Sequence, residues 1–336
     1  MTNPYLNYAG KRLIQAVVVV LLAYVFTFIV VSILPGDPVT NVLRNPQNGF
    51  TEAEIQEIIA AQGLDKPVLV QLSTSFSHFV IGDLGISMRT NRPVTTLIGD
   101  VLPSTLILAF AGLAVALLLA ISIAYGSRFL RKEFGQGLLR GFPSLFLSVP
   151  NFVIGLVLIH IFGFQLGLFR VIKPDSFWAT FFAALALGIP ISAQIAEVLI
   201  ANLDHEAGQE YAAVARSRGL SQMRLFARHL LKPSSLPVVT VIALTIGELL
   251  GGSLITEAVF GRNGIGSLVQ RSVSTQDLPV LQAIVSLAAV VFVVVNLLAD
   301  LAYPLLDPRV KLLGSAERRP ATADDNSAAL SQAVKS

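Results

Sequence analysis

The stretch PSTLILAFAGLAVALLLAISIAYG, residues 103–126, decides the fold because its 24 positions include no charged residue. A hydrocarbon core of about 30 Å is crossed by roughly 20 residues of α-helix. In lipid, only a helix or a closed barrel satisfies its own backbone hydrogen bonds. The stretch therefore predicts a transmembrane helix.

Five further stretches are also long and apolar enough to cross a membrane as a helix. They lie at 13–34, 142–163, 177–200, 235–256 and 279–303. Composition supports the same interpretation. Of the 336 residues, 54% are hydrophobic and 13% are charged, and the mean hydropathy is +0.70. A soluble domain has about 25% charged residues. We therefore predict an all-α membrane protein with six transmembrane helices, the last five forming a core over residues 103–312.

Basic residues between the predicted spans indicate the orientation of the chain. With residues 1–12 in the cytoplasm, the cytoplasmic segments hold 16 of the 24 Lys and Arg residues, and the external segments hold eight. Such an excess is the usual bias of cytoplasmic loops. We expect a multi-pass protein with both termini in the cytoplasm, and the net charge of +3 reflects topology rather than nucleic-acid binding.

The terminal and external segments have their own patterns. Residues 35–102 predict an external cap, because Thr51-Glu-Ala-Glu54 has the pattern of a capping box that opens a short helix. A second amphipathic helix is expected to start at Pro67. The tail, residues 313–336, is polar, aperiodic and rich in alanine, and we expect it to be disordered.

The cytoplasmic loop 202–234 is far longer than a tight connection between two helices. Residues 209–217 predict a short helix with small residues on one side, which permit close approach by another surface. Arginines stand at its C-terminal end, where cations suit the helix dipole, and a glycine suits a left-handed stop. The residues in question are Glu210, Tyr211, Ala212, Ala213, Ala215, Arg216, Arg218 and Gly219. From these residues alone, the segment is either a force-transmitting helix or an ordinary basic helix at the membrane surface.

A family resemblance favours the first interpretation. Glu210-Tyr-Ala-Ala-Val-Ala-Arg-Ser-Arg-Gly219, followed by Arg228-His229 and Leu236-Pro237, resembles the cytoplasmic EAA loop of ABC importer permeases. In that family, this loop is the coupling helix that sits in a cleft on the ATPase subunit. The match departs from Glu-Ala-Ala-x3-Gly in its first two positions, which are Ala213 and Val214, and the later Leu-Pro lies farther from the glycine than in the general consensus. Both departures are similar to the peptide-permease branch.

Other motifs along residues 11–312 resemble the dipeptide, oligopeptide and nickel branch, in the order found in its first permease subunit. They are Leu34-Pro-Gly-Asp-Pro38, Gly63-Leu-Asp-Lys-Pro67, Gly82-Asp-Leu-Gly-Ile-Ser87, Glu257-Ala-Val-Phe-Gly261, Gly264-Ile-Gly266, Asp277-Leu-Pro279 and Asn296-Leu-Leu-Ala-Asp300. The resemblance implies the type I ABC importer permease fold in a bacterial cytoplasmic (inner) membrane.

The same resemblance implies partners and a mechanism. A second homologous permease would complete a heterodimer, one or two ATPase subunits would bind ATP and Mg, and an extracytoplasmic binding protein would deliver a dipeptide or oligopeptide. This chain would carry no cofactor, since it contains no Gly-x4-Gly-Lys-Ser/Thr sequence. Nickel, glutathione or another small solute is the alternative cargo.

Glu248 stands well inside the predicted fifth span, where a carboxylate is costly enough to indicate a function. It could neutralise the amino end of a peptide, together with Gly251 and Gly252 beside it. Alternatively it could make a structural hydrogen bond or lie near the outer surface. Gly247 and Gly251 form a Gly-x3-Gly pair, a pattern typical of close helix packing.

Two other classes of membrane protein agree less well with the sequence. An ion-coupled secondary transporter would have inverted repeats and several acids near the membrane midplane. An intramembrane hydrolase would need matched catalytic or metal-binding side chains within the spans. The chain has no cysteine, and His205-Glu206-Ala-Gly-Gln209 lacks the second imidazole of a zinc protease motif. We therefore expect neither a catalytic residue nor a metal site.

Overall fold

The computed structural model describes residues 4–33, 44, 49, 51–62, 65–130 and 136–306. These residues are mostly helical. The sequence motif at residues 34–38, the start of the motif at residues 63–67 and the tail 313–336 lie outside them. The helices, in chain order, are α1 (Pro4–Ile33), α2 (Glu52–Gln62), α3 (Val68–Val80), α4 (Val94–Phe129), α5 (Gln136–Leu147), α6 (Asn151–Leu158), α7 (Phe177–Gly208), α8 (Glu210–Ser217), α9 (Gln222–Leu225), α10 (Leu231–Val259), α11 (Ile265–Ser274) and α12 (Leu278–Leu306).

Five helical stretches are long and apolar enough to cross a membrane: α1, α4, α7, the continuous run from α9 to α10, and α12. Each contains one of the predicted spans and is longer than predicted at one or both ends. Residues 4–12, for example, were expected to precede the first span but continue α1. Membrane helices extend past the apolar core, so hydropathy marks the lipid-facing part and not the full helix.

The third predicted span, 142–163, is not one straight helix. Helix α5 and the run from α6 through the π-helical segment Ile159–Gln165 meet at an angle of 105°. Pro150 stands at this break as the N-cap of α6, where it lacks the N–H that a continuous helix would need. The described residues therefore form six spans only if this bent pair counts as one.

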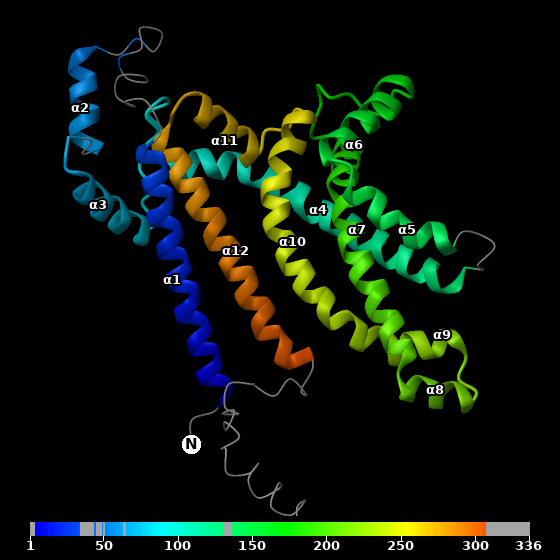
Figure 1. The fold of residues 1–336 in the computed structure, drawn as a ribbon. Coiled ribbons are helices and arrows are strands. Elements are labelled where there is room, and N and C mark those ends of the chain that lie inside the picture. The colour runs from blue at the N-terminus through cyan, green and yellow to red at the C-terminus, as the bar shows by residue number, and fades with distance from the viewer. Residues whose placement is uncertain are drawn as a thin grey trace, which may run out of the picture.

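Helix α7 lies at the centre of the fold and packs against α4, α5, α6 and α10 (Figure 1). Its buried face consists largely of small and branched residues, among them Ala183, Ala186, Ile195 and Ala196. Small side chains permit close contact between spanning helices. At Gly188, a Cβ atom would meet the carbonyl oxygen of Gly112 in α4 at 2.8 Å, so α4 and α7 are in near backbone contact.

The two ends of the bundle carry different elements (Figure 1). Helices α2, α3 and α11 lie at one end, whereas the start of α1 and helices α8 and α9 lie at the other. Helix α2 begins with the expected capping box, because the Thr51 backbone N–H donates to Glu54 and the Glu54 N–H donates back to Thr51 Oγ1. Helix α3 begins after Pro67, and its Phe76 and Phe79 pack against Tyr24 of α1.

Candidate coupling site and transport pathway

The predicted coupling helix is present as α8, with Gln209 as its N-cap. Its C-terminal end is a Schellman motif, in which the Leu220 N–H donates to Ala215 O and the Gly219 N–H donates to Arg216 O. Gly219 has φ of +78°, which is the left-handed conformation that the sequence predicts. Most of the expected loop 202–234 is therefore helical, because α7 runs on to Gly208 and α10 already begins at Leu231.

The two faces of α8 differ in what they contact. Ala212 is fully buried and Ala215 packs against the core of the chain. Both small residues therefore let α8 pack on its own bundle. The expected docking of this segment on an ATPase subunit stays a prediction. The outward face presents Glu210, Tyr211, Ala213, Val214 and Arg218, all of them exposed. Val214 lies near the middle of that face, with 49% of its surface exposed.

Arg216 links α8 to the last turn of α7 by a hydrogen bond. Its Nη2 donates to Ala207 O at 2.5 Å, and its Nε donates to Ala212 O at 3.2 Å. Ala207 lies in the last turn of α7, where carbonyl groups have no partner within the helix and a cation is favoured. A displacement of α8 would therefore be transmitted to α7.

Tyr211 adds a second contact between α8 and α7. Its hydroxyl donates to Glu206 Oε2 at 2.6 Å and approaches the carbonyl oxygen of His229 at 3.5 Å. Partial burial and the hydrogen bond to Glu206 raise the pKa of Tyr211 to about 12. The hydroxyl thus remains a donor over the physiological pH range.

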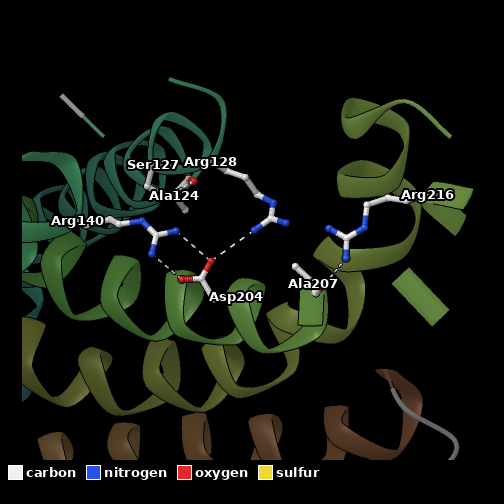
Figure 2. A network of polar contacts seen from close by, with 7 residues as sticks. All are labelled: Ala124, Ser127, Arg128, Arg140, Asp204, Ala207 and Arg216. Carbon is white, nitrogen blue, oxygen red and sulfur yellow. Dashed lines mark hydrogen bonds and ion pairs between the residues drawn. The ribbon is translucent and has the colours of Figure 1, made fainter. Parts of the chain in front are cut away.

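An ionic network lies next to the contact between α8 and α7 and was not predicted from the sequence (Figure 2). Asp204 of α7 accepts two hydrogen bonds from Arg140 of α5, at 2.8 and 3.0 Å, and one from Arg128 of α4, at 3.4 Å. Asp204 is 64 and 76 positions away from these two arginines in the chain. No local sequence pattern joins the three residues, although their charges on neighbouring helices were a usable signal.

The candidate pathway residue Glu248 is exposed on α10 and accepts a hydrogen bond from Gln194 Nε2 of α7 at 3.0 Å. Glu197, one turn further along α7, is also exposed. Glu197 lies near the end of the fourth predicted span, 177–200, and within α7. Polar groups of two spanning helices therefore share one exposed face at the α7–α10 contact.

The glycines around Glu248 differ in their surroundings. A Cβ atom at Gly247 would approach the Phe292 ring of α12 to 2.8 Å, so this glycine serves packing within the chain. Gly251 is exposed, and a Cβ atom at this position would meet no other atom within 4 Å. Gly252 follows it in α10. The Gly-x3-Gly pair is thus split, because only its first member contacts a neighbouring helix of the described chain.

A buried polar cluster, unforeseen as a site, joins helices at the α11 end. Glu257 of α10 is fully buried and accepts hydrogen bonds from Thr105 Oγ1 at 2.7 Å and from the Gly266 N–H at 2.8 Å. Arg262, also buried, donates to Pro174 O and Thr180 Oγ1. Residues 261–264 form a turn, and the absence of a side chain at Gly264 leaves room for the Glu257 carboxylate.

Asp277 makes a similar link in the connection between α11 and α12. It accepts hydrogen bonds from Ser87 Oγ at 2.5 Å and from the Met88 N–H at 3.1 Å. The residue is 4% exposed, and burial raises the pKa of its carboxyl group above the usual value of 3.8, although these hydrogen bonds lower it in part. The segment before α4 is thereby held to the start of α12.

Among the described residues, no group of three or more His, Asp or Glu side chains could hold a metal ion. The chemistry of the sites above is hydrogen bonding and charge neutralisation.

Comparisons with known proteins agree over most of the chain. Residues 116–312 match the family described as "Binding-protein-dependent transport system inner membrane component", and residues 5–109 match the N-terminal region of the same kind of component. The glutathione transport system permease protein GsiC of Escherichia coli (strain K12) is 31% identical over 307 residues, covering 91% of this chain and 99% of that protein. The same protein of Salmonella typhimurium (strain LT2) gives the same values.

A solved structure shows the same fold. The crystal structure of an amino acid ABC transporter with histidines matches with a TM-score of 0.50 and 18% sequence identity. The match covers 63% of this chain and 94% of that one.

Proposed function

Since this chain belongs to the inner-membrane components of binding-protein-dependent transport systems, we propose that it forms half of the translocation pathway of a dipeptide or oligopeptide importer. It is a permease subunit of an ABC importer and not an enzyme. An ATPase and an extracytoplasmic binding protein are the partners of such a system. Beyond this family membership, we propose the peptide cargo, the second permease subunit and the cytoplasmic position of both termini.

The geometry of α8 is the observation that carries the proposal. Its inner face is packed on the bundle and tied to α7 by Arg216, while its outer face leaves Val214 exposed among polar side chains. A short helix that is rigidly joined to a spanning helix and open on its other face suits force transmission. In this proposal, α8 docks on an ATPase subunit, where ATP and Mg bind, and α7 moves with it relative to α10.

The orientation follows from the same arrangement. If α8 meets a cytoplasmic ATPase, the start of α1 lies in the cytoplasm as well, because both are at one end of the bundle (Figure 1). Helices α2, α3 and α11 then face the binding protein. The distribution of Lys and Arg residues supports this orientation.

A short peptide suits the exposed α7–α10 face. A zwitterionic peptide carries an ammonium group, and Glu248 offers a carboxylate held by Gln194. Glutathione is a second candidate because the curated relatives transport it, and as a modified tripeptide it presents the same ammonium and carboxylate groups. In this proposal, a second, homologous permease supplies the opposite wall of the pathway.

The test replaces Val214 by arginine in the complete transporter, reconstituted with its ATPases and binding protein. Val214→Arg is preferable to a change at Gly219, whose positive φ would strain any side chain there. Val273→Arg, on α11 at the other end, is the matched control because Val273 is 52% exposed in a helix. We expect Val214→Arg to abolish copurification of the ATPase and peptide-stimulated ATP hydrolysis, whereas Val273→Arg keeps the ATPase bound. Retained copurification and stimulation in Val214→Arg would refute the assignment of α8.

The cargo is tested separately, by uptake into proteoliposomes of a labelled dipeptide, an oligopeptide, glutathione and nickel ion. Competition among them with the cognate binding protein identifies the class. Uptake of nickel alone would contradict the peptide proposal and leave the coupling assignment intact.

A further inference from the structure

A cavity of about 240 Å³ lies beside α8, and arginines from three helices line it. Its lining residues are Arg128, Arg140, Arg216, Gln222, Leu225 and Leu230. Figure 2 shows the three guanidinium groups in one row above α7, with Arg128 between the other two. The cavity is thus a place where α4, α5 and α8 converge with cationic side chains.

The charges around this cavity are not balanced by the residues that face them. Among the described residues, three guanidinium groups meet one carboxylate, that of Asp204, which leaves an excess of two positive charges. Asp204 is engaged mainly by Arg140, and Arg216 donates to neutral carbonyl oxygens. Arg128 reaches Asp204 only at 3.4 Å, although its side chain is no more than 22% exposed. Arg140 is more open, with 41% of its side chain exposed. A bound anion stabilises clustered like charges of this kind.

The kind of anion follows from the side chains. Guanidinium groups present planar pairs of N–H donors that match the oxygens of a phosphate group. We propose that this cavity binds a phosphate group, with Arg128 and Arg140 as the principal donors. Asp204 competes with the ligand for these donors.

The surroundings favour the headgroup of an anionic phospholipid as the source of the phosphate. Leu118, Ile121 and Tyr125 are exposed on α4 and lead, at spacings of three and four residues, along one helix face to Arg128. An acyl chain along this apolar stripe would place its headgroup at the arginines. Basic pockets between spanning helices are known to receive such headgroups. Lipid bound here would contact α4, α5 and the coupling helix together.

The experiment measures the melting temperature of the purified, complete transporter in detergent during titration with phosphatidylglycerol, relative to phosphatidylcholine, and in parallel with inorganic phosphate. A ligand that binds only the folded state raises the melting temperature by an amount that grows with the ratio of ligand concentration to Kd. The variants are Arg140→Gln, which removes a donor, and Asp204→Asn, which removes the competing carboxylate. Arg170→Gln is the control, because Arg170 is an exposed arginine far from the cavity, in the segment before α7.

We expect the Arg140→Gln variant to need about tenfold more phosphatidylglycerol than the Arg170→Gln variant for the same increase in melting temperature. Asp204→Asn should need several-fold less than the wild type, because its arginines are free to bind phosphate. The Asp204→Asn variant is informative because removing a carboxylate from a purely structural ion pair would not increase the affinity for phosphatidylglycerol. A response to lipid alone identifies the headgroup as the occupant, and an arginine-dependent response to inorganic phosphate as well identifies free phosphate. Equal responses of Arg140→Gln and Arg170→Gln, or no gain in Asp204→Asn, would overturn the proposal.

Discussion

The guanidinium group of Arg216 in α8 lies 2.5 Å from the carbonyl oxygen of Ala207 in the last turn of α7. This hydrogen bond joins the candidate coupling helix directly to the central helix of the bundle. A docking surface on α8 would have no mechanical effect if α8 were loosely attached. Together with the contact between Tyr211 and Glu206, this bond would carry movement of a partner on α8 to α7.

Arg216→Ala is expected to separate docking from coupling. The charged hydrogen bonds to Ala207 and Ala212 are lost, but the outward face with Val214 is kept. The ATPase subunits should still copurify, while peptide-stimulated ATP hydrolysis falls by about tenfold, since such bonds contribute roughly 1.5–3 kcal/mol. Arg224→Ala, an exposed arginine in neighbouring α9, serves as the control and should retain stimulation. Full stimulation in Arg216→Ala would exclude this bond as the mechanical link.

Glu248→Gln tests the pathway through the charge of the cargo. The substitution keeps the shape of the side chain and its contact with Gln194 but removes the negative charge. We expect the apparent KM for a peptide with a free amino terminus to rise about tenfold in proteoliposome uptake. An N-acetylated peptide that the binding protein still accepts should show no change, because it lacks the ammonium group. Equal KM values for the free peptide in the two proteins would leave Glu248 with a structural role.

Gly266→Ala and Gly251→Ala should have opposite effects on stability. A Cβ atom at Gly266 would overlap Leu254 Cα and lie 2.9 Å from Glu257 Oε2, so α11 or α10 must shift. Overpacking of this kind costs about 1–3 kcal/mol, and the melting temperature in detergent should fall by several degrees. Gly251 has open space around it, and alanine favours a helix by about 0.5–1 kcal/mol, so Gly251→Ala should be neutral or stabilising. Equal melting temperatures for the two variants would contradict the described packing at Gly266.

Asp277 gives a prediction for pH. Burial raises the pKa of this carboxyl group in the folded protein above the usual 3.8, so the folded state binds the proton more tightly than the unfolded state does. The free energy of unfolding should therefore decrease as pH rises from about 3.8 through the folded-state pKa. Asp277→Asn removes this dependence. As pH rises through that interval, the melting temperature of the wild type should fall relative to that of Asp277→Asn. Above the interval, the difference between the two melting temperatures should be constant. A difference that is the same at all pH values would show that burial does not perturb this group.

Local sequence predicted the parts of this protein that local interactions control. The capping box at Thr51, the helix after Pro67 and the left-handed turn at Gly219 are present because each depends on a few consecutive residues. The apolar stretches correctly located the spanning helices, because a helix in lipid needs an apolar surface over its whole length. The helix ends were less predictable, since beyond the membrane core hydropathy no longer distinguishes helix from loop.

For the site residues as well, the sequence predicted local features but not tertiary contacts. Residues 209–219 were found from their order in the chain, yet their order did not reveal that Ala212 and Ala215 face inward while Val214 faces outward. Asp204, Arg128 and Arg140 were missed as a cluster because 64 and 76 positions separate Asp204 from the two arginines in the sequence.

The sequence by itself thus determined a polytopic helical chain, its family and the position of the short helix α8, because hydropathy and short motifs are properties of consecutive residues. The tertiary structure decided the 105° bend before α6, the contact of Gln194 with Glu248, and the meeting of three arginines at one cavity. These features depend on which faces of distant helices come together. That choice is made by packing around α7, and no short stretch of sequence encodes it.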